Sequence, residues 1–274
     1  MHRSLKGKTL FITGASRGIG AAIALRAAAD GANTVIAAKS ARRHPKLPGT
    51  IHSVASQAAD AGGTALAVEM DLRDEQSVRA AIRQCMNRFG GIDILVNNAG
   101  AIWLAGTLET PIKRFDLMMA VNVRGTFLCS QSALPYLLKS ANPHILNLAP
   151  PPDLDPRWFR NHGAYTISKY GMSLCTLGMA AEFSGRVAVN ALWPRTVIAT
   201  AAVNMLGGKI QAENCRTPAI VADAACSILT RDHKTCSGRF FLDEDVLREE
   251  GMQDFTGYAV KAGADLELDL FVDQ

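Results

Sequence analysis

Short apolar runs alternate with longer segments of helical periodicity along almost the whole chain. Seven runs are candidate strands, at residues 8–13, 34–38, 65–68, 92–96, 144–148, 187–192 and 239–242. Helical periodicity follows at 18–30, 50–61, 75–89 and from about 111. Runs that are apolar at nearly every position suit strands covered on both faces, and alternation with helices predicts a parallel sheet between two helical layers.

The predicted fold class is therefore α/β, with one doubly wound, Rossmann-type domain around a seven-stranded parallel sheet. A chain of 274 residues is long enough for one large core and short for two domains. We assign residues 1–250 to this domain and residues 251–274 to a short C-terminal extension that forms no separate domain. Within the extension, residues 266–270 alternate apolar and acidic side chains, which predicts a half-exposed strand at a sheet edge or a subunit contact.

Composition narrows the class of protein. Hydrophobic residues make up 48% and charged residues 20%, which is typical of a globular protein and excludes a disordered chain. A net charge of +4 could attract phosphorylated ligands but predicts no nucleic-acid partner. No apolar run is long enough for a membrane span, and the N-terminus has no signal-peptide core. Six cysteines without a C-x-x-C pair predict reduced thiols, no metal site and a cytoplasmic location.

A glycine-rich segment between the first strand and the first helix predicts a nucleotide site. It reads Gly14-Ala15-Ser16-Arg17-Gly18-Ile19-Gly20, with the spacing G-x-x-x-G-x-G. Glycines let the backbone approach a pyrophosphate closely, and the amide groups of a helix N-terminus favour its negative charge. The three glycines alone are weak support, and their place between a strand and a helix makes the prediction firmer.

The end of the second strand distinguishes NAD from NADP. A site selective for NAD carries an acidic residue there, whereas this strand ends in Ala38-Lys39-Ser40. Lys39, together with Arg17 of the glycine loop, could pair with the 2′-phosphate of NADP(H). The alternative is that both are solvated surface cations.

Four motifs together resemble the short-chain dehydrogenase/reductase family over roughly residues 6–245. They are the glycine loop, Asn97-Asn98-Ala99-Gly100, Asn122, and Tyr165 followed four residues later by Lys169. Segments 38–40, 44–47, 145–147 and 190–194 indicate one particular branch of that family. The resemblance implies an NADP(H)-dependent oxidoreductase that moves a hydride to or from a carbonyl carbon. It also implies that Lys169 holds the nicotinamide ribose, that Asn122 supports a water-linked proton path, and that residues 98–100 line the adenosine side.

Tyr165 and Lys169 would share one face of a helix. A phenol titrates near 10, so action as a base near neutrality needs a drop of about 3 units, or roughly 4 kcal/mol. One ammonium about 4 Å away in a partly shielded site, at an effective dielectric constant of about 20, would supply about that much. In the reducing direction the neutral phenol is already the proton donor. The alternative is an ordinary amphipathic helix face.

Two further cofactor contacts follow from the resemblance. Asp71 corresponds to a residue that contacts adenine, although it could equally be the N-cap of the helix starting at residue 75. In the segment 193–200, Pro194, Ile198 and Thr200 correspond to the loop that meets the nicotinamide amide. That loop departs from the family pattern because Arg195 stands where glycine is usual and the loop is one residue longer.

The serine that the family places before the tyrosine is missing. The corresponding positions are Ala149, Pro150 or Pro152, and none has a side chain that can donate a hydrogen bond to a substrate carbonyl. Asn147, Asn161 or His162 could substitute, or Tyr165 could act alone. The chain could also be an NADP-binding sensor or lipid-binding protein with little turnover.

Apolar residues dominate the loops expected around the substrate. They are Trp103, Pro150, Pro151, Trp158, Phe159, Trp193 and Met205. Together they favour a lipophilic carbonyl such as a steroid, retinoid or fatty-acyl derivative, although each could instead belong to the core. We expect residues 205–208 to form a lid. The resemblance implies homodimers or homotetramers built on helices near 111–138 and 164–183.

Overall fold

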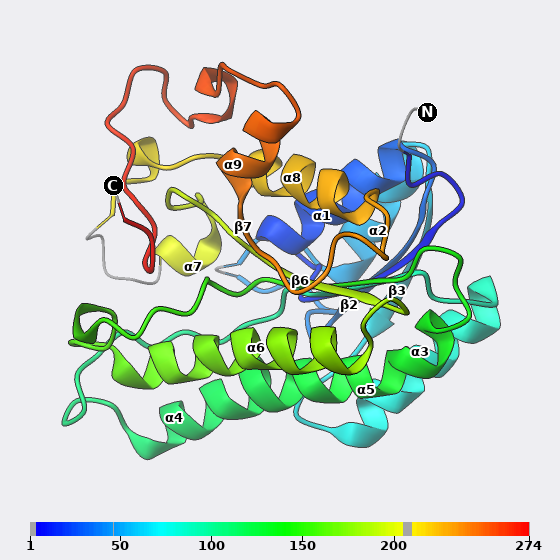
Figure 1. Ribbon diagram of the computed structural model, residues 1–274, viewed down its shortest axis with the longest axis horizontal. Coiled ribbons are helices and arrows are strands. Elements are labelled where there is room, and N and C mark those ends of the chain that lie inside the picture. Colours follow the sequence, from blue (N-terminus) through cyan, green and yellow to red (C-terminus); the bar gives the residue numbers. More distant parts are fainter. Residues whose placement is uncertain (1–3, 46, 205–209, 274) are drawn as a thin grey trace.

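The computed structural model describes residues 4–45, 47–204 and 210–273, and it contains one seven-stranded parallel sheet between two layers of helices (Figure 1). The strands are β1 (Thr9–Thr13), β2 (Asn33–Ala38), β3 (Thr64–Glu69), β4 (Ile94–Asn97), β5 (His144–Asn147), β6 (Ala188–Trp193) and β7 (Phe240–Leu242). Their spatial order is β3-β2-β1-β4-β5-β6-β7, and every pairing is parallel. The predicted fold class is confirmed.

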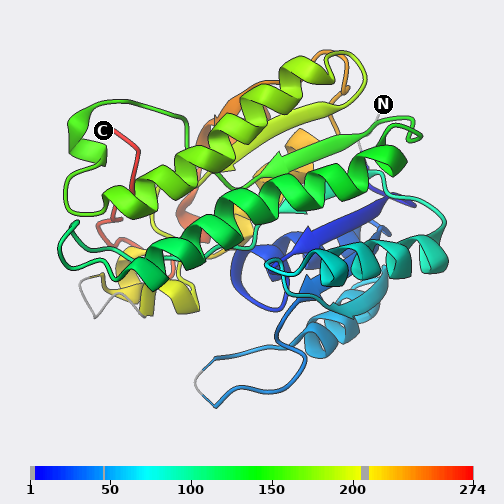
Figure 2. The ribbon, with the colours of Figure 1, turned by 90° about the horizontal axis from the view of Figure 1, so that it is seen from below.

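The helices form two layers, one on each face of the sheet (Figures 1 and 2). One layer holds α1 (Gly18–Ala29), α2 (Ile51–Asp60), α8 (Ala219–Leu229) and α9 (Asp243–Glu249). The other holds α3 (Glu75–Phe89), α4 (Ile112–Met118), the π-helix η1 (Met119–Arg124), α5 (Gly125–Leu137) and α6 (Gly163–Glu182). Short helices complete the chain, namely η2 (Pro156–Trp158), α7 (Ala201–Asn204), η3 (Ala212–Asn214) and η4 (Thr256–Tyr258).

The two largest hydrophobic clusters lie between the sheet and its two helical layers. All residues of β1, β4, β5 and β6 are buried, because helices cover both faces of the central strands. The outer strand β3 is mostly half-exposed.

All six cysteines are free thiols, and burial raises the pKa of Cys85 to about 12, consistent with a packing role. Within the described ranges, no helix has the length and apolar character needed to cross a membrane.

Helix α3 shows how local sequence sets a boundary. Its N-cap is Asp74, whose carboxylate accepts a hydrogen bond from the backbone N–H of Gln76 at 2.9 Å. The helix ends at Gly90, which has a φ of +77°. The alternative reading of Asp71 as this N-cap is therefore wrong, because the chain makes one further turn before the helix begins.

The C-terminal extension differs from the predicted edge strand. Leu268 forms an isolated antiparallel bridge with Thr196, and the backbone N–H of Asp269 donates to the carbonyl of Arg195 at 3.0 Å. The segment thus pairs with the chain just beyond β6 and not with an edge of the sheet. Its last apolar side chains turn inward, and Phe271 is only 4% exposed. Alternation of side chains could not distinguish this inward course from an exposed strand.

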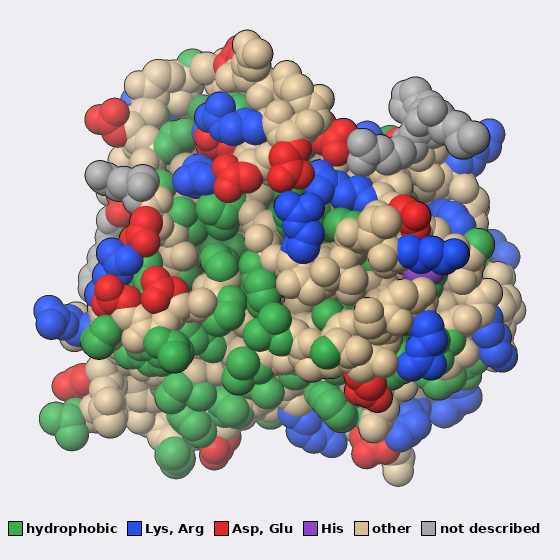
Figure 3. Space-filling model, viewed as in Figure 1, with side chains coloured by type: hydrophobic (Ala, Val, Ile, Leu, Met, Phe, Trp, Pro, Cys, Tyr) green, Lys and Arg blue, Asp and Glu red, His purple; other side chains and the backbone are tan. Residues whose placement is uncertain are grey.

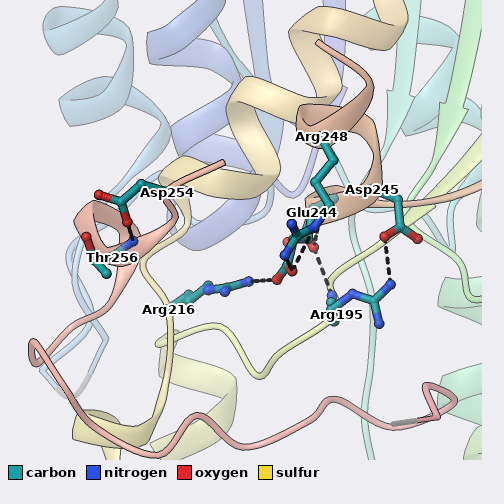
Figure 4. A network of polar contacts seen from close by, with 8 residues as sticks. Arg195, Arg216, Glu244, Asp245, Arg248, Asp254 and Thr256 are labelled. Carbon is teal, nitrogen blue, oxygen red and sulfur yellow. Dashed lines mark hydrogen bonds and ion pairs between the residues drawn. The ribbon is translucent and has the colours of Figure 1, made fainter. Parts of the chain in front are cut away.

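A buried network of charges joins this region to α9 (Figure 4). The Glu244 carboxylate accepts from Arg216 at 2.5 Å and from Arg248 at 2.6 Å. Its neighbour Asp243 accepts from the backbone N–H of Arg195 at 2.9 Å. Burial raises the pKa of Asp243 to about 6. The segment after β6 is therefore fixed on one side by α9 and on the other by the extension.

We predict that Glu244→Gln destabilises the chain by about 3 kcal/mol, because it leaves the buried Arg216 guanidinium without its charged partner. Equilibrium urea unfolding measures the loss. The matched control is Glu75→Gln, which breaks an exposed ion pair with Arg79 and should cost at most about 0.5 kcal/mol. Equal losses in the two variants would contradict the prediction.

Candidate active site

The candidate site lies at the carboxyl ends of β1 and β4, where the strand order reverses. The chain leaves β1 through Gly14, which has a φ of +67°. A side chain there would lie 2.7 Å from the Cα atom of Ala99. The glycine loop therefore packs directly against the segment that follows β4, and only glycine allows this approach.

Thr13 and Asn98 hold this contact together. The Thr13 hydroxyl oxygen accepts from the backbone N–H groups of Asn98 and Ala99, both at 3.1 Å. The Asn98 side-chain amide donates to the carbonyls of Thr13 at 2.9 Å and of Gly14 at 3.2 Å. A side chain on Gly20 would overlap the same amide. Gly20 and Asn98 thus fix the shape of the loop.

A cavity of about 470 Å³ opens along this loop. Its lining includes eleven of the predicted cofactor residues, namely Gly14, Ser16, Arg17, Gly18, Ile19, Lys39, Asp71, Asn98, Ala99, Gly100 and Thr200. Helix α1 begins beside it without a side-chain cap hydrogen bond at its N-cap. Its first N–H groups therefore remain suited to an anion such as a pyrophosphate.

Charges gather where the second strand ends. The Lys39 ammonium lies 3.4 Å from the Asp71 carboxylate, and Arg73 lies 2.6 Å from the same oxygen. These cations hold the pKa of Asp71 well below its usual range, chiefly through the Arg73 hydrogen bond. Arg17 donates to the Ser40 hydroxyl at 3.0 Å. Sequence reasoning missed Arg73, although its position two residues beyond Asp71 could have indicated it.

Tyr165 and Lys169 are both buried on α6, with 7% and 5% of their surfaces exposed. The Lys169 ammonium donates to the carbonyl of Leu148, just beyond β5, at 2.5 Å. It also lies 4.8 Å from the centre of the Trp193 ring. Both side chains line a cavity of about 340 Å³, which is also lined by the predicted nicotinamide contacts Pro194, Ile198 and Thr200.

Burial dominates the protonation of this pair. It raises the pKa of Tyr165 above its ordinary value near 10, and it lowers the pKa of Lys169 to about 7. The direction for Tyr165 is opposite to the lowering that the spacing with Lys169 predicted, because burial disfavours the phenolate and the charge of Asp269 adds to that effect. Tyr165 is therefore a protonated phenol near neutrality, which suits proton donation.

Asn122 lies in the π-helix between α4 and α5 and is completely buried. Its side-chain oxygen accepts from the backbone N–H of Ala101 at 2.7 Å. Its amide donates to the carbonyl of Ala101 and to the hydroxyl of Ser168, each at 2.9 Å. The side chain thus links the segment after β4 to α6, on which Tyr165 stands. π-Helical turns are frequent at functional sites.

The predicted substitutes for the missing serine do not reach this cavity. The Asn147 side chain accepts from Asn97 and donates to Thr176, both at 2.8 Å, within the core. His162 is the N-cap of α6, and its ring contacts Phe271. Asn147, Asn161 and His162 are all absent from the described residues that line the cavity.

Phe271, which was not among the predicted apolar residues around the substrate, contacts several of the aromatic rings in this region. Its ring contacts those of Trp158, Tyr165, Tyr170 and Trp193, with ring centres 5.4–6.2 Å apart. Trp158 therefore packs against the extension, whereas Trp193 also lines the cavity. Met205 and the predicted lid at 205–208 lie outside the described residues. Sequence reasoning missed Phe271, because nothing near it marks it as part of the site.

We predict that Asn122→Ala lowers the free energy of unfolding by about 2 kcal/mol, since it leaves the Ala101 backbone groups and the Ser168 hydroxyl without their buried partner. The control Asn87→Ala lies at an exposed position of α3, where alanine is the better helix former, and should be neutral or slightly stabilising. Denaturant unfolding distinguishes them, and a neutral Asn122 variant would refute the linking role.

Comparison with known proteins shows the family of the chain. The model of the short chain dehydrogenase family matches residues 8–209. Hydroxysteroid dehydrogenase-like protein 2 from Danio rerio is 58% identical over 269 residues, which are 98% of this chain and 65% of the relative. The Homo sapiens protein of that name is 57% identical over 270 residues, covering 98% of this chain and 64% of the relative. The chain thus spans slightly less than two thirds of these relatives, and they belong to the branch that its sequence indicated.

Solved structures show the same architecture. A Xanthomonas campestris protein, 60% identical, has a TM-score of 0.97, with 99% of this chain and all of that chain covered. A short chain dehydrogenase from Mycobacterium thermoresistibile, 50% identical, has a TM-score of 0.93 with 99% and 97% covered. A metagenomic short-chain oxidoreductase solved in complex with NADP is 27% identical, with a TM-score of 0.71 and coverage of 87% and 96%.

Proposed function

Since the chain belongs to the short chain dehydrogenase family, we propose that it is an NADP(H)-dependent oxidoreductase acting on a lipophilic carbonyl or alcohol. The observation that carries the proposal is the buried pair of Tyr165 and Lys169 facing a cavity. That cavity and the cleft along the glycine loop have Ile19, Asn98 and Gly100 as common lining residues. A ligand extended along the loop would therefore end beside the phenol.

The residues of the cleft suit NADP(H), which when bound would supply or accept the hydride. The glycine loop and the uncapped start of α1 would hold the pyrophosphate. Lys39 and Arg17, supported by Arg73, would face the 2′-phosphate. Asp71 and residues 98–100 would meet the adenosine, and Pro194, Ile198 and Thr200 would meet the nicotinamide. The NADP complex of a related oxidoreductase supports this choice.

Tyr165 would act as the acid or base at the substrate oxygen. During reduction its phenol donates a proton to the carbonyl oxygen, and its raised pKa keeps that proton available. Lys169 would hold the nicotinamide ribose, and Asn122 would maintain the turn on which a proton path depends. Ala149 and Pro150 have no side chain that can donate a hydrogen bond, so Tyr165 would be the donor to the substrate oxygen. The absence of a second donor such as the family's serine typically costs about 10²–10³ in rate.

The absence of the family's serine supports a second candidate function. A site that binds NADP(H) tightly but lacks the serine could act as an NADP-dependent sensor or lipid-binding protein with little turnover. Ala149 and Pro150 favour this alternative, because the backbone N–H of Ala149 already donates to the Asn147 carbonyl at 2.9 Å and Pro150 has no N–H to donate.

The substrate class and assembly follow from apolar surfaces. The cavity is lined by the apolar side chains of Ile102, Leu104, Leu268 and Leu270, which favours a lipophilic substrate, and the relatives' names mention a hydroxysteroid.

Exposed apolar side chains also gather over α6 and the adjacent helix α5 (Figure 3), including Leu174 at 62% exposure. We therefore propose a homodimer or homotetramer built on these helices.

We predict that the purified protein oxidises NADPH in the presence of at least one member of a panel of lipophilic aldehydes, ketones and acyl thioesters. Tyr165→Phe should lower that rate by at least about 100-fold, because it removes the proton donor. Unchanged NADPH binding by Tyr165→Phe is the control for folding. Tight NADPH binding without turnover on any substrate would favour the sensor.

We also predict that Lys39→Asp weakens NADPH binding by about 100-fold or more relative to NADH, because a carboxylate would replace a cation beside the 2′-phosphate. Isothermal titration calorimetry with both cofactors measures the change. Lys113→Asp on the exposed start of α4 is a matched charge reversal and should leave the ratio unchanged. An unaltered preference in Lys39→Asp would contradict the assignment to NADP(H).

A further inference from the structure

The C-terminal extension contributes two acidic residues, Glu267 and Asp269, to the lining of the cavity of Tyr165 and Lys169, and Asp269 is the one whose charge acts on both of these side chains. The segment is fixed on both sides of this residue. The backbone N–H of Val197 donates to the Glu267 carbonyl at 2.9 Å, and the Trp193 indole donates to the Leu270 carbonyl at 2.7 Å. Hydrogen bonds to the backbone on both sides of Asp269 therefore hold this residue at the site.

The stacking of Phe271 strengthens this placement. Its ring lies against that of Tyr165, with centres 6.2 Å apart and planes inclined by 29°. One oxygen of Asp269 accepts from the backbone N–H of Leu270 at 2.7 Å. The charged or titratable groups that act on this carboxyl are Lys169 of α6 and Asp243 at the start of α9. The carboxyl in turn acts on Tyr165, Lys169 and the Cys215 thiol.

The electrostatic effect of Asp269 has the same sign on both groups of α6. A nearby negative charge raises the pKa of the Tyr165 phenol and raises the pKa of the Lys169 ammonium, because it disfavours loss of a proton from either. For Lys169 this opposes the lowering by burial. Burial also raises the pKa of Asp269 itself to about 7, so the carboxylate exerts its effect mainly above neutrality.

Building on the oxidoreductase function proposed above, we propose that Asp269 is a positioning residue whose charge favours the protonated forms of Tyr165 and Lys169 and so extends upward the pH range of carbonyl reduction. The proton that reaches the carbonyl oxygen comes from the Tyr165 hydroxyl, and a solvent proton restores the phenol afterwards. Asp269 acts through its charge and transfers no proton in this step. It adds an electrostatic control to a site in which the usual serine is missing.

The first test follows Lys169 directly and needs no substrate. In the full chain labelled with ¹³C at lysine Cε, NMR should detect one lysine with a midpoint near 7, and the signal should vanish in Lys169→Met. In Asp269→Asn, which retains the oxygen that accepts from Leu270, we expect this midpoint to fall by at least about half a unit. The control Asp265→Asn removes an exposed charge from the same extension and should leave it unchanged.

The second test uses the pH profile of kcat/KM for reduction with NADPH. Loss of the Asp269 charge lowers both pKa values, so the decline of activity at alkaline pH should begin at lower pH in Asp269→Asn and not in Asp265→Asn. A Lys169 midpoint that is the same in the wild type and Asp269→Asn overturns the role of Asp269, whether or not turnover occurs. A shifted midpoint without any NADPH-dependent turnover supports the electrostatic effect of Asp269 on Lys169, but it contradicts the oxidoreductase function and with it the effect on the pH range of reduction.

Discussion

Burial of the Lys169 ammonium is the constraint on which the candidate site depends. A cation removed from water must keep polar partners, and Lys169 has the Leu148 carbonyl just beyond β5 and the face of the Trp193 ring at the end of β6. These partners come from the carboxyl ends of neighbouring strands. The parallel sheet therefore fixes where the lysine can lie, and α6 then places Tyr165 one turn away on the same face.

The same desolvation explains why the protonation of the pair differs from simple pairwise expectation. An ammonium near a phenol should lower the pKa of the phenol, yet burial acts on both groups and opposes each charged form. The spacing of Tyr165 and Lys169 shows that they share a helix face. It does not show how completely the surrounding elements exclude water, and the degree of burial decides whether the pKa of Tyr165 rises or falls.

Features encoded locally could be predicted from the sequence. Seven apolar runs predicted the seven strands, and the glycine-rich segment was predicted between the first strand and the first helix, where Gly14 packs against Ala99 and Gly20, in the first turn of α1, packs against Asn98. Contacts between distant segments could not be predicted. Arg73 lies near Lys39 only because β2 and β3 are neighbours, and Phe271 reaches Tyr165 across more than a hundred residues. The alternation at 266–270 predicted an edge strand or a subunit contact, whereas this segment pairs with the chain beyond β6 and lines the cavity.

The course of the extension has a consequence for how this protein can be handled. Residues 271 and 272 are buried against the aromatic rings beside Tyr165, so polypeptide that continues past residue 273 starts within a few residues of the cavity that Tyr165 and Lys169 line. The other terminus leads into β1 at the opposite, amino edge of the sheet (Figure 1). An affinity handle or fluorescent fusion therefore belongs at the amino end, where it leaves the surroundings of Tyr165 intact.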